Sequence, residues 1–323
     1  MTFTVFIDGE EGTTGLQIRQ RLEGRGELAL IHLAGAARKD AAARREALNA
    51  ADLAILCLPD EAAREAVAMI DNPRTRVIDA STAHRTADGW VYGFPEMTPD
   101  QPERIAAAAR VSNPGCYATG AVALIRPLVT AGLLPADHPV LVNAVSGYSG
   151  GGKALIARFE DPAAGSPIAC DYFAYGLTLE HKHVPEMQRH AGLGRRPLFA
   201  PGVGRFRQGM IVQVPLQLWA LPARPAVDAV RETLRGHYRG RRFVTVADPS
   251  ETAVRAAQLD PGELNDTNHL RLFVFGNQDR EQVVLAAQLD NLGKGAAGQT
   301  VQNMNLMLGL PETAGLEGEP LPA

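Results

Sequence analysis

Residues 3–25 read FTVFIDGEEGTTGLQIRQRLEGR, and they decide how the chain begins to fold. The apolar run Phe3–Ile7 predicts a strand, the glycines that follow predict a tight turn, and the stretch from Leu16 to about Arg25 predicts a helix. Glycines in such a turn let the backbone approach a pyrophosphate, whose charge is favoured by the free amides and the dipole of the helix. The stretch therefore predicts a dinucleotide-binding unit. Its glycines are spaced Gly-x-x-Gly-x-x-Gly rather than Gly-x-Gly-x-x-Gly, so a turn that binds nothing is the alternative.

The expected dinucleotide contacts lie in this turn and after the second strand, Leu28–Leu33. That strand is followed by Arg38 and Lys39, and no carboxylate stands at its end to hold the ribose hydroxyl of NAD. Two cations suit a 2′-phosphate, so we expect NADP. Asp40 leaves NAD open as an alternative, and a solvated loop that contacts no cofactor is a second alternative. The cofactor-binding residues of the turn are expected to be Gly9, Gly12, Thr13, Thr14 and Gly15.

The downstream pattern changes from alternating strands and helices to strands without long helices between them. Asp52–Leu58 and Arg76–Asp79 are short buried strands, and a helix between them ends at Ala68, which is typical of a parallel, doubly wound sheet. The later strands predict a mixed or antiparallel sheet: Val140–Val145, Met210–Leu218, Arg242–Val246, Leu270–Gly276 and Gln282–Asp290. We therefore expect an α/β protein with an N-terminal Rossmann-like parallel sheet and a second α+β domain. A last helix is expected at about Gly295–Leu308.

Length, charge and cysteine usage narrow the class of protein. The chain has 323 residues, enough for about two domains, and its net charge of -4 gives no reason to expect nucleic acid or an anionic membrane as a partner. No apolar run is long enough to span a bilayer, and the first residues have no features of a secretory leader. The 3 cysteines have no CxxC spacing, so we expect no disulfide framework, no metal site and a reducing cytoplasm.

The octet SNPGCYAT at 112–119 indicates a nucleophile. Pro114 and Gly115 predict a turn, and Cys116 stands at the start of a helix, where the dipole and free amides favour a thiolate. The same amides suit an oxyanion, and a thioester accepts hydride, so a cysteine here fits acyl reduction. The alternative is a small buried cysteine. Cys57 lies mid-strand and is expected in the core, and Cys170 is left unassigned.

Two histidines and several cations are candidates for the rest of the site. His181 and His183 precede a helix that begins near Pro185, and one of them is the expected general acid/base. No third ligand accompanies them, so a metal site is disfavoured. The alternative is that both are surface histidines without a catalytic role. Cations and loop donors for phosphate or carboxylate groups complete the set: Arg85, Asn113, Ser146, Gly147, Lys153, Arg205 and Arg207. The loop 147–152 could equally be a flexible hairpin or lid.

Seven segments together resemble one family. They are FIDGEEGTTGLQI at 6–18, DASTAHR at 79–85, YGFPEM at 92–97, SNPGCYAT at 112–119, VSGYSGGGK at 145–153, HKHVPEM at 181–187 and DNLGKGAAGQTVQNMNLM at 290–307. In this order they resemble the shorter form of N-acetyl-gamma-glutamyl-phosphate reductase, from arginine biosynthesis, within the semialdehyde dehydrogenase superfamily. The resemblance covers residues 3 to 310.

The resemblance implies a reaction and an organisation. It implies NADPH-dependent reduction of N-acetylglutamyl 5-phosphate to the semialdehyde through a thioester on Cys116, with His183 favoured over His181 as acid/base. It also implies that Ser81, Asn291 and Gly295 lie near the cofactor. It implies an NADP-binding domain of residues 1–115 and 295–323, a catalytic and dimerisation domain of residues 116–294, and a homodimer or homotetramer. Gly293 stands where the family commonly has valine, which would loosen that loop.

Three other functions remain open at this stage. A sister reductase could use the same chemistry on aspartyl phosphate or on a protein-carried aminoadipyl phosphate. A non-catalytic NADP-binding regulator would need the glycine turn but not Cys116 with the histidines. A cofactor-free thiol hydrolase would need the cysteine but not the turn.

Overall fold

The computed structural model describes residues 2–316, and these form two compact units. Residues up to Gly115 and those from Ala296 onward make the first unit, and Cys116–Gly295 make the second. The chain thus crosses between the units at two places. The first domain expected from the sequence also included residues 1 and 317–323, which lie outside the described residues.

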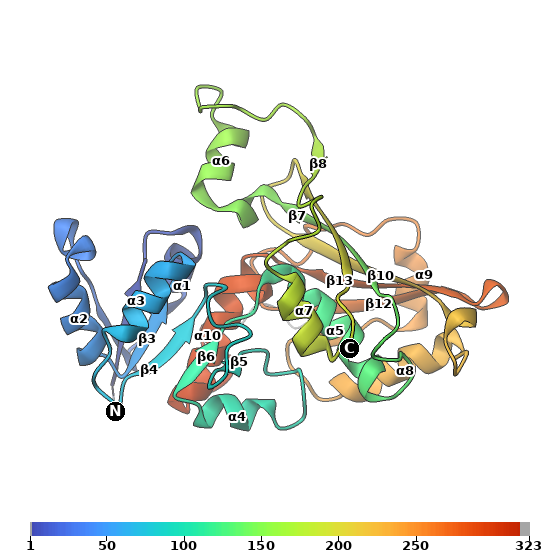
Figure 1. Cartoon of the computed structure of the whole chain (residues 1–323), viewed down its shortest axis with the longest axis horizontal. Coiled ribbons are helices and arrows are strands. Elements are labelled where there is room, and N and C mark those ends of the chain that lie inside the picture. The colour runs from blue at the N-terminus through green and yellow to red at the C-terminus, as the bar shows by residue number, and fades with distance from the viewer. Residues whose placement is uncertain (1, 317–323) are drawn as a thin grey trace. The chain divides into compact units, whose positions relative to one another are not determined.

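The first unit is built on a six-stranded parallel sheet with the order β2-β1-β3-β4-β6-β5 (Figure 1). From β1 the order runs to β2 on one side and to β3 and β4 on the other, as in a doubly wound sheet, and β6 and β5 complete the second side. The strands are β1 (Phe3–Asp8), β2 (Leu28–Ile31), β3 (Leu53–Leu56), β4 (Arg76–Asp79), β5 (Val91–Tyr92) and β6 (Arg110–Ser112). All four residues of β3 are buried, because a central parallel strand is covered on both faces.

Helices cover this sheet in two layers. Alternate strand residues such as Phe6 and Leu56 pack against Leu48 and Ala63, which come from α2 (Ala41–Ala50) and α3 (Asp60–Ala68). The other layer consists of neighbouring helices α1 (Thr13–Leu22), α10 (Gly298–Leu308) and α4 (Gln101–Ala107). A 3-10 turn, Gly35–Lys39, leads from β2 into α2.

The second unit holds a seven-stranded mixed sheet with the order β11-β12-β13-β10-β7-β9-β8. Its centre is antiparallel: β12 (Leu270–Asn277), β13 (Gln282–Leu289), β10 (Met210–Gln217) and β7 (Leu141–Gly147) pair in turn. Parallel pairs flank it, joining β7 to β9 (Leu198–Gly204) and β11 (Val244–Val246) to β12, while β8 (Tyr172–Ala174) pairs antiparallel with β9.

Helix α5 (Cys116–Thr130) packs on this sheet against β10 and β13 and is flanked by α7 (Val184–Ala191) and α8 (Val227–Tyr238) (Figure 1). It is buried on almost every side, from Tyr117 to Ile125. Helix α9 (Pro249–Arg255) packs on β12. Between β7 and β8 the chain forms a turn, Tyr148–Gly151, and helix α6 (Gly152–Glu160), which has no buried residue.

The expected fold class is confirmed, and several elements differ in detail. Helix α1 begins three residues earlier than expected, at Thr13, because the turn ends at Gly12. The alanine-rich stretch after Asp40 is helix α2, and Asp40 caps it by accepting from the amide of Ala43 at 2.8 Å. No strand was predicted between residues 146 and 209, but β9 runs from Leu198 through Pro201 to Gly204. Of the described helices, none has the length and apolar character needed to cross a membrane.

Candidate functional site

The glycine turn packs directly against the end of β3. Gly9 has φ +91°, and a Cβ atom there would lie 2.3 Å from the carbonyl oxygen of Cys57, so only glycine fits. Gly15 is equally restricted, because its Cβ would lie 2.4 Å from the Gly9 oxygen. Gly12 has no such conflict, the nearest atom being the Gly9 oxygen at 3.4 Å, so the missing side chain leaves space above the turn.

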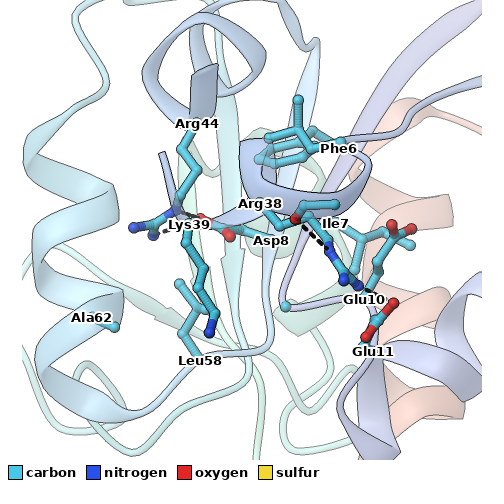
Figure 2. Close-up of a pocket in the computed structure, with 13 residues that line it drawn as sticks. Phe6, Ile7, Asp8, Glu10, Glu11, Arg38, Lys39, Arg44, Leu58 and Ala62 are labelled. Atoms are coloured by element: carbon cyan, nitrogen blue, oxygen red, sulfur yellow. Dashed lines mark hydrogen bonds and ion pairs between the residues drawn. The ribbon is translucent and has the colours of Figure 1, made fainter. Parts of the chain in front are cut away.

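A cavity of about 550 Å³ opens beside this turn (Figure 2). It lies within the first unit and is lined by Phe6, Ile7, Asp8, Gly9, Glu10, Glu11, Leu33, Gly35, Arg38, Lys39, Arg44, Leu58 and Ala62. The side chains come from β1, the turn, the loop after β2, α2, and the loop and helix after β3. An apolar cleft with a few charged groups is what a nucleotide requires.

Two of the three cations of the cavity are ion-paired. Arg38 pairs with Glu11, and Arg44 donates from Nη2 and Nε to one oxygen of Asp8 at 2.8 Å and 3.1 Å (Figure 2). Asp8 is buried at the end of β1, so Arg44 is fixed in place. The expected cations Arg38 and Lys39 both line the cavity. The sequence reasoning missed Arg44, whose only local signal was its place on a helix that was not recognised.

These residues fit a dinucleotide on structural grounds. The hydroxyl of Thr13, at the first position of α1, is buried and makes no hydrogen bond in the described structure. A buried hydroxyl without a hydrogen-bond partner at a helix N-terminus can donate a hydrogen bond to a pyrophosphate oxygen. The turn, the hydroxyl and the cations would hold the pyrophosphate and the adenosine end of the cofactor.

Ser81, Arg85 and Asn113 are also brought together in the first unit, at the carboxyl ends of β4 and β6. Ser81 donates its hydroxyl to Asp79 at 2.7 Å, and Asp79 also bonds Nδ1 of His84 at 2.6 Å. Arg85 donates to the carbonyl oxygens of Asn113 and Ala80, both at 3.0 Å. Ligands of open parallel sheets bind at this edge.

Asn113 hydrogen-bonds the segment with which the chain returns to the first unit. Its amide donates to the Ala296 carbonyl at 3.1 Å, and its oxygen accepts from Asn303 of α10 at 3.0 Å. Both side-chain groups therefore have intramolecular partners within the first unit. A substrate contact of Asn113, like that of Arg85, stays a prediction.

Cys116 is the first residue of the second unit and the first residue of α5. Its thiol is partly exposed and forms no disulfide, and a Cβ atom on Gly295 would lie only 2.8 Å from the Cys116 Cβ. Its neighbour Tyr117 places its ring 6.0 Å from that of His181 and 5.8 Å from that of His183. Both expected histidines thus lie around the ring of the residue that directly follows the expected nucleophile.

The two histidines have different environments. The ring of His181 accepts from the backbone amide of His183 at Nδ1, at 3.1 Å, and its Nε2 lies 3.3 Å from the hydroxyl of Tyr175. His183 is buried at the N-terminus of α7, with its ring 4.8 Å from that of His181. Burial is the largest cause that raises the pKa of Tyr175, to about 12, and the charge of Cys116 adds to it. Sequence reasoning missed Tyr175, for which no local signal exists.

The other expected anion-binding residues of the second unit lie around α6. Ser146 and Gly147 end β7, and Lys153 is exposed at the start of α6. Arg205 pairs with Asp171 at 3.2 Å, and Arg207 pairs with Glu160 at 3.3 Å, so both guanidinium groups contact the α6–β8 segment. A phosphate clamp made by these arginines stays a prediction.

Asn291 and Asp290 order the loop before α10. Asn291 accepts from the Gly209 amide at 2.8 Å and donates to the Ser149 hydroxyl at 2.9 Å. Burial raises the pKa of Asp290, while donors that include the amide of Leu292 oppose the rise. A Cβ on Gly293 would lie 2.0 Å from the Thr267 oxygen. Close packing therefore leaves no room for a side chain at Gly293. The expected loosening of the loop stays a prediction.

The remaining cysteines differ from Cys116 in their surroundings. Cys57 lies just after β3, beside Gly9, and it is half-buried rather than in the middle of a core strand as expected. Desolvation still raises the pKa of its thiol to about 12. Cys170 is exposed. Among residues 2–316, no three His, Cys, Asp or Glu side chains gather in a way that could hold a metal ion.

Two family models match the chain. The model described as "Semialdehyde dehydrogenase, NAD binding domain" matches residues 4–105, and "Semialdehyde dehydrogenase, dimerisation domain" matches residues 116–291. Among solved structures, aspartate semialdehyde dehydrogenase II from Vibrio cholerae has a TM-score of 0.68 at 15% identity, covering 95% of this chain and 98% of the other. The enzyme from Candida albicans, solved with NADP, has a TM-score of 0.64 at 13% identity, covering 95% and 99%. These likenesses establish the fold.

Sequence relatives are much closer. N-acetyl-gamma-glutamyl-phosphate reductase 2 of Pseudomonas putida is 56% identical, over 97% of this chain and 99% of the relative. The reductase of Rhizobium meliloti is 55% identical, over 94% and 98%. The cofactor is a nicotinamide dinucleotide, as the NAD-binding family model and the cavity chemistry indicate. The chain is an oxidoreductase of the semialdehyde dehydrogenase fold, and it belongs to the N-acetyl-gamma-glutamyl-phosphate reductase family.

Proposed function

We propose that the chain reduces N-acetyl-L-glutamyl 5-phosphate to N-acetyl-L-glutamate 5-semialdehyde and phosphate, with NADPH as the reductant, in arginine biosynthesis in the cytoplasm. The observation that carries the proposal is that Cys116 opens the buried helix α5, whose next residue, Tyr117, has its ring 6.0 Å and 5.8 Å from those of His181 and His183. Relatives named for this reaction are similar over nearly the whole chain.

Cys116 is the nucleophile in this mechanism. The α5 dipole and the amides of its first turn favour the thiolate. The sulfur attacks the acyl carbon, and the bond from that carbon to the phosphate oxygen breaks, with the electron pair leaving on phosphate. The product is a thioester on Cys116. When bound, the nicotinamide supplies the hydride that reduces this acyl group. The Cys116 sulfur then leaves as the aldehyde carbonyl forms.

His183 is the proton carrier of this proposal. Nδ1 of His181 accepts a backbone hydrogen bond, so its lone pair is engaged and neutral His181 carries its proton on Nε2. A ring in that state is a donor rather than a base. His183 therefore takes the thiol proton of Cys116 and returns it to the leaving phosphate.

NADP, rather than NAD, is the proposed cofactor because three cations line the cavity in the first unit. Arg38 and Arg44 already neutralise Glu11 and Asp8, whereas Lys39 has no ion pair within residues 2–316, so Lys39 is the expected first contact of a 2′-phosphate. The first unit then serves as the cofactor domain and the second as the catalytic and dimerisation domain. A homodimer or homotetramer is proposed from the dimerisation-domain match.

The test is phosphate-dependent reduction of NADP with N-acetylglutamate 5-semialdehyde. Cys116→Ala is expected to lose turnover by several orders of magnitude while binding NADPH with unchanged affinity in a fluorescence titration. Cys170→Ala, which changes an exposed thiol, is the matched control and is expected to stay active. Full activity of Cys116→Ala would overturn the mechanism. A preference of the wild type for aspartate semialdehyde would overturn the substrate.

A further inference from the structure

A buried carboxylate and a histidine form a pair at the carboxyl end of β4. Asp79, the last residue of this strand, is fully buried, and its Oδ2 lies 2.6 Å from Nδ1 of His84. The same oxygen accepts the hydroxyl of Ser81 at 2.7 Å, and Oδ1 accepts the Ser81 amide at 2.9 Å. Because Ser81 donates to the carboxylate and not to the imidazole, the group is not the nucleophile and base of a serine hydrolase. The mechanism proposed above does not use His84.

The carboxylate decides which nitrogen of His84 carries a proton. A carboxylate only accepts hydrogen bonds, so Nδ1 is protonated and Nε2 of the neutral ring keeps its lone pair. Within residues 2–316, Nε2 has no hydrogen-bond partner, and it is accessible, since 12% of the side chain is exposed. The ring stacks on Trp90 with the ring centres 4.1 Å and the planes 13° apart, which fixes the plane of the imidazole. His84 therefore presents an oriented hydrogen-bond acceptor at the surface of the first unit.

The loop that carries His84 is anchored on both sides of β4. Thr82 donates its amide, at 2.9 Å, and its hydroxyl to the carboxylate of Asp60, which begins α3 after β3. Arg85 donates to the carbonyl oxygen of Asn113, which follows β6, at 3.0 Å. Strands β3 and β6 are the two neighbours of β4 in the sheet. A side chain on such an anchored loop can bind a ligand at little cost in ordering.

The strand register places this pair close to the glycine turn. Asp8, which precedes the turn, is aligned with Leu56 of β3, and Leu56 is aligned with Asp79. Because neighbouring strands lie about 4.8 Å apart, Asp79 lies about 10 Å from Asp8 along the carboxyl edge of the sheet. The cavity suited to the adenosine end includes the loop after β2, and β2 lies on the other side of β1 from β4. A dinucleotide with its pyrophosphate at the turn would therefore extend its other half over the ends of β3 and β4.

We propose that His84 binds the nicotinamide half of the cofactor, with Nε2 accepting a hydrogen bond from a hydroxyl of the nicotinamide ribose. A ribose hydroxyl is a donor and suits a neutral acceptor, whereas pyrophosphate oxygens only accept hydrogen bonds and do not pair with a nitrogen lone pair. This inference rests on the proposed function for the identity of the cofactor, and it requires neither Cys116 nor the acyl substrate.

The test measures the binding of three nucleotides to the wild type and to His84→Asn by isothermal titration calorimetry. The probes are NADPH, 2′-phosphoadenosine 5′-diphosphoribose, which lacks the nicotinamide ring, and 2′-phosphoadenosine 5′-diphosphate, which also lacks the second ribose. An asparagine amide can donate to Asp79 in place of Nδ1 but has no atom at the position of Nε2, so the variant is expected to keep the wild-type Tm. It is expected to bind the first two probes about 3- to 10-fold more weakly, which is the usual effect of one neutral hydrogen bond, and the third probe equally.

The control is His138→Ala, which removes an imidazole from the loop between α5 and β7 of the second unit and is expected to bind all three probes like the wild type. Equal binding of every probe to the wild type and His84→Asn would overturn the inference. Weaker binding of all three probes would also overturn it, because the contact would then lie at the pyrophosphate or the fold would be disturbed. Weaker binding of NADPH alone would place the contact at the carboxamide and overturn the assignment to the ribose.

The same titrations separate this inference from the proposed reaction. A wild type that shows the expected binding pattern but does not turn over N-acetylglutamate 5-semialdehyde would overturn the proposed function and keep the role of His84.

Discussion

Gly295 packs its α-carbon against Cys116, and a methyl group at position 295 would lie 2.8 Å from the Cys116 Cβ. The amide of Gly295 is held by the Asp290 carbonyl at 2.9 Å, so the loop cannot easily retreat. The position of Cys116, the proposed nucleophile, therefore depends on a residue far away in the sequence.

Gly295→Ala is expected to displace Cys116 and to lower kcat by about 10- to 100-fold, because a shift of about 1 Å in a reacting group has that effect. Steady-state kinetics, and the burst of p-nitrophenolate released when p-nitrophenyl acetate acetylates Cys116, measure it. Gly236→Ala, at an exposed position of α8 with no atom within 4 Å of the added methyl, is the control and keeps wild-type rates. Normal kinetics in Gly295→Ala would show that the contact does not position the sulfur.

Gly9→Ala is expected to destabilise the first unit and weaken cofactor binding. The positive φ alone costs about 1–2 kcal/mol for an alanine, and overlap with the Cys57 carbonyl adds to it. Thermal unfolding and NADPH titration measure the two effects. Gly26→Ala, which has open space around its Cβ, is the matched control. An unchanged Tm in Gly9→Ala would contradict the packing described for the turn.

Lys39→Ala is expected to lower the ratio of kcat/KM for NADPH over NADH by about tenfold, since a charged hydrogen bond to phosphate is worth roughly 1.5–3 kcal/mol. Glu11→Gln is expected to raise the same ratio, because it frees Arg38 from its ion pair. Kinetics with both cofactors at two salt concentrations provide the measurement. If the ratio stays constant in both variants, the 2′-phosphate does not bind at these cations.

Cys57 makes the stability of the first unit depend on alkaline pH. Burial raises the pKa of its thiol from 9.0 to about 12, so the folded chain keeps the proton while the unfolded chain loses it. The free energy of unfolding therefore falls between pH 9 and 12, and at pH 10.5 it is lower by about 2 kcal/mol than below pH 9. This contribution is complete below pH 9 and is lost as the pH rises toward 12.

The measurement is the change in unfolding free energy between pH 8 and pH 10.5. Cys57→Ala is expected to show a drop smaller than that of the wild type by about the 2 kcal/mol given above. Cys170→Ala, with its exposed thiol, is expected to keep the full drop. Identical drops in wild type and Cys57→Ala would mean that Cys57 is not protected in the fold.

Local patterns predicted those parts of the fold that local interactions determine. The glycine turn, strand β4 and the cysteine at the start of α5 follow from nearby residues. Strand β9 could not be predicted, because its glycines indicate a loop. In the structure, the ring of Tyr172 fills the space beside Gly202, where a Cβ would lie 2.3 Å from the tyrosine hydroxyl, and pairing with β7 and β8 keeps the strand extended.

The same distinction applies to the candidate site. Cys116 and the histidine pair are recognisable by residue type and spacing. Arg44 and Tyr175 are not, since their places in the site arise from a contact with Asp8 at the end of another element and from a hydrogen bond to His181. Asp40 is an N-cap residue that indicates helix α2 from the sequence. Predicting this helix would have been needed to identify Arg44.

The two places where the chain crosses between the units impose an order on biosynthesis. The second unit is one continuous stretch, Cys116–Gly295, whereas the first unit needs α10, the last described helix to leave the ribosome. Until then the Gly93 carbonyl lacks the amide donors of Gln299 and Asn303, which bond it at 2.6 Å and 2.9 Å. During translation the nascent first unit therefore stays incomplete while the second unit emerges and folds.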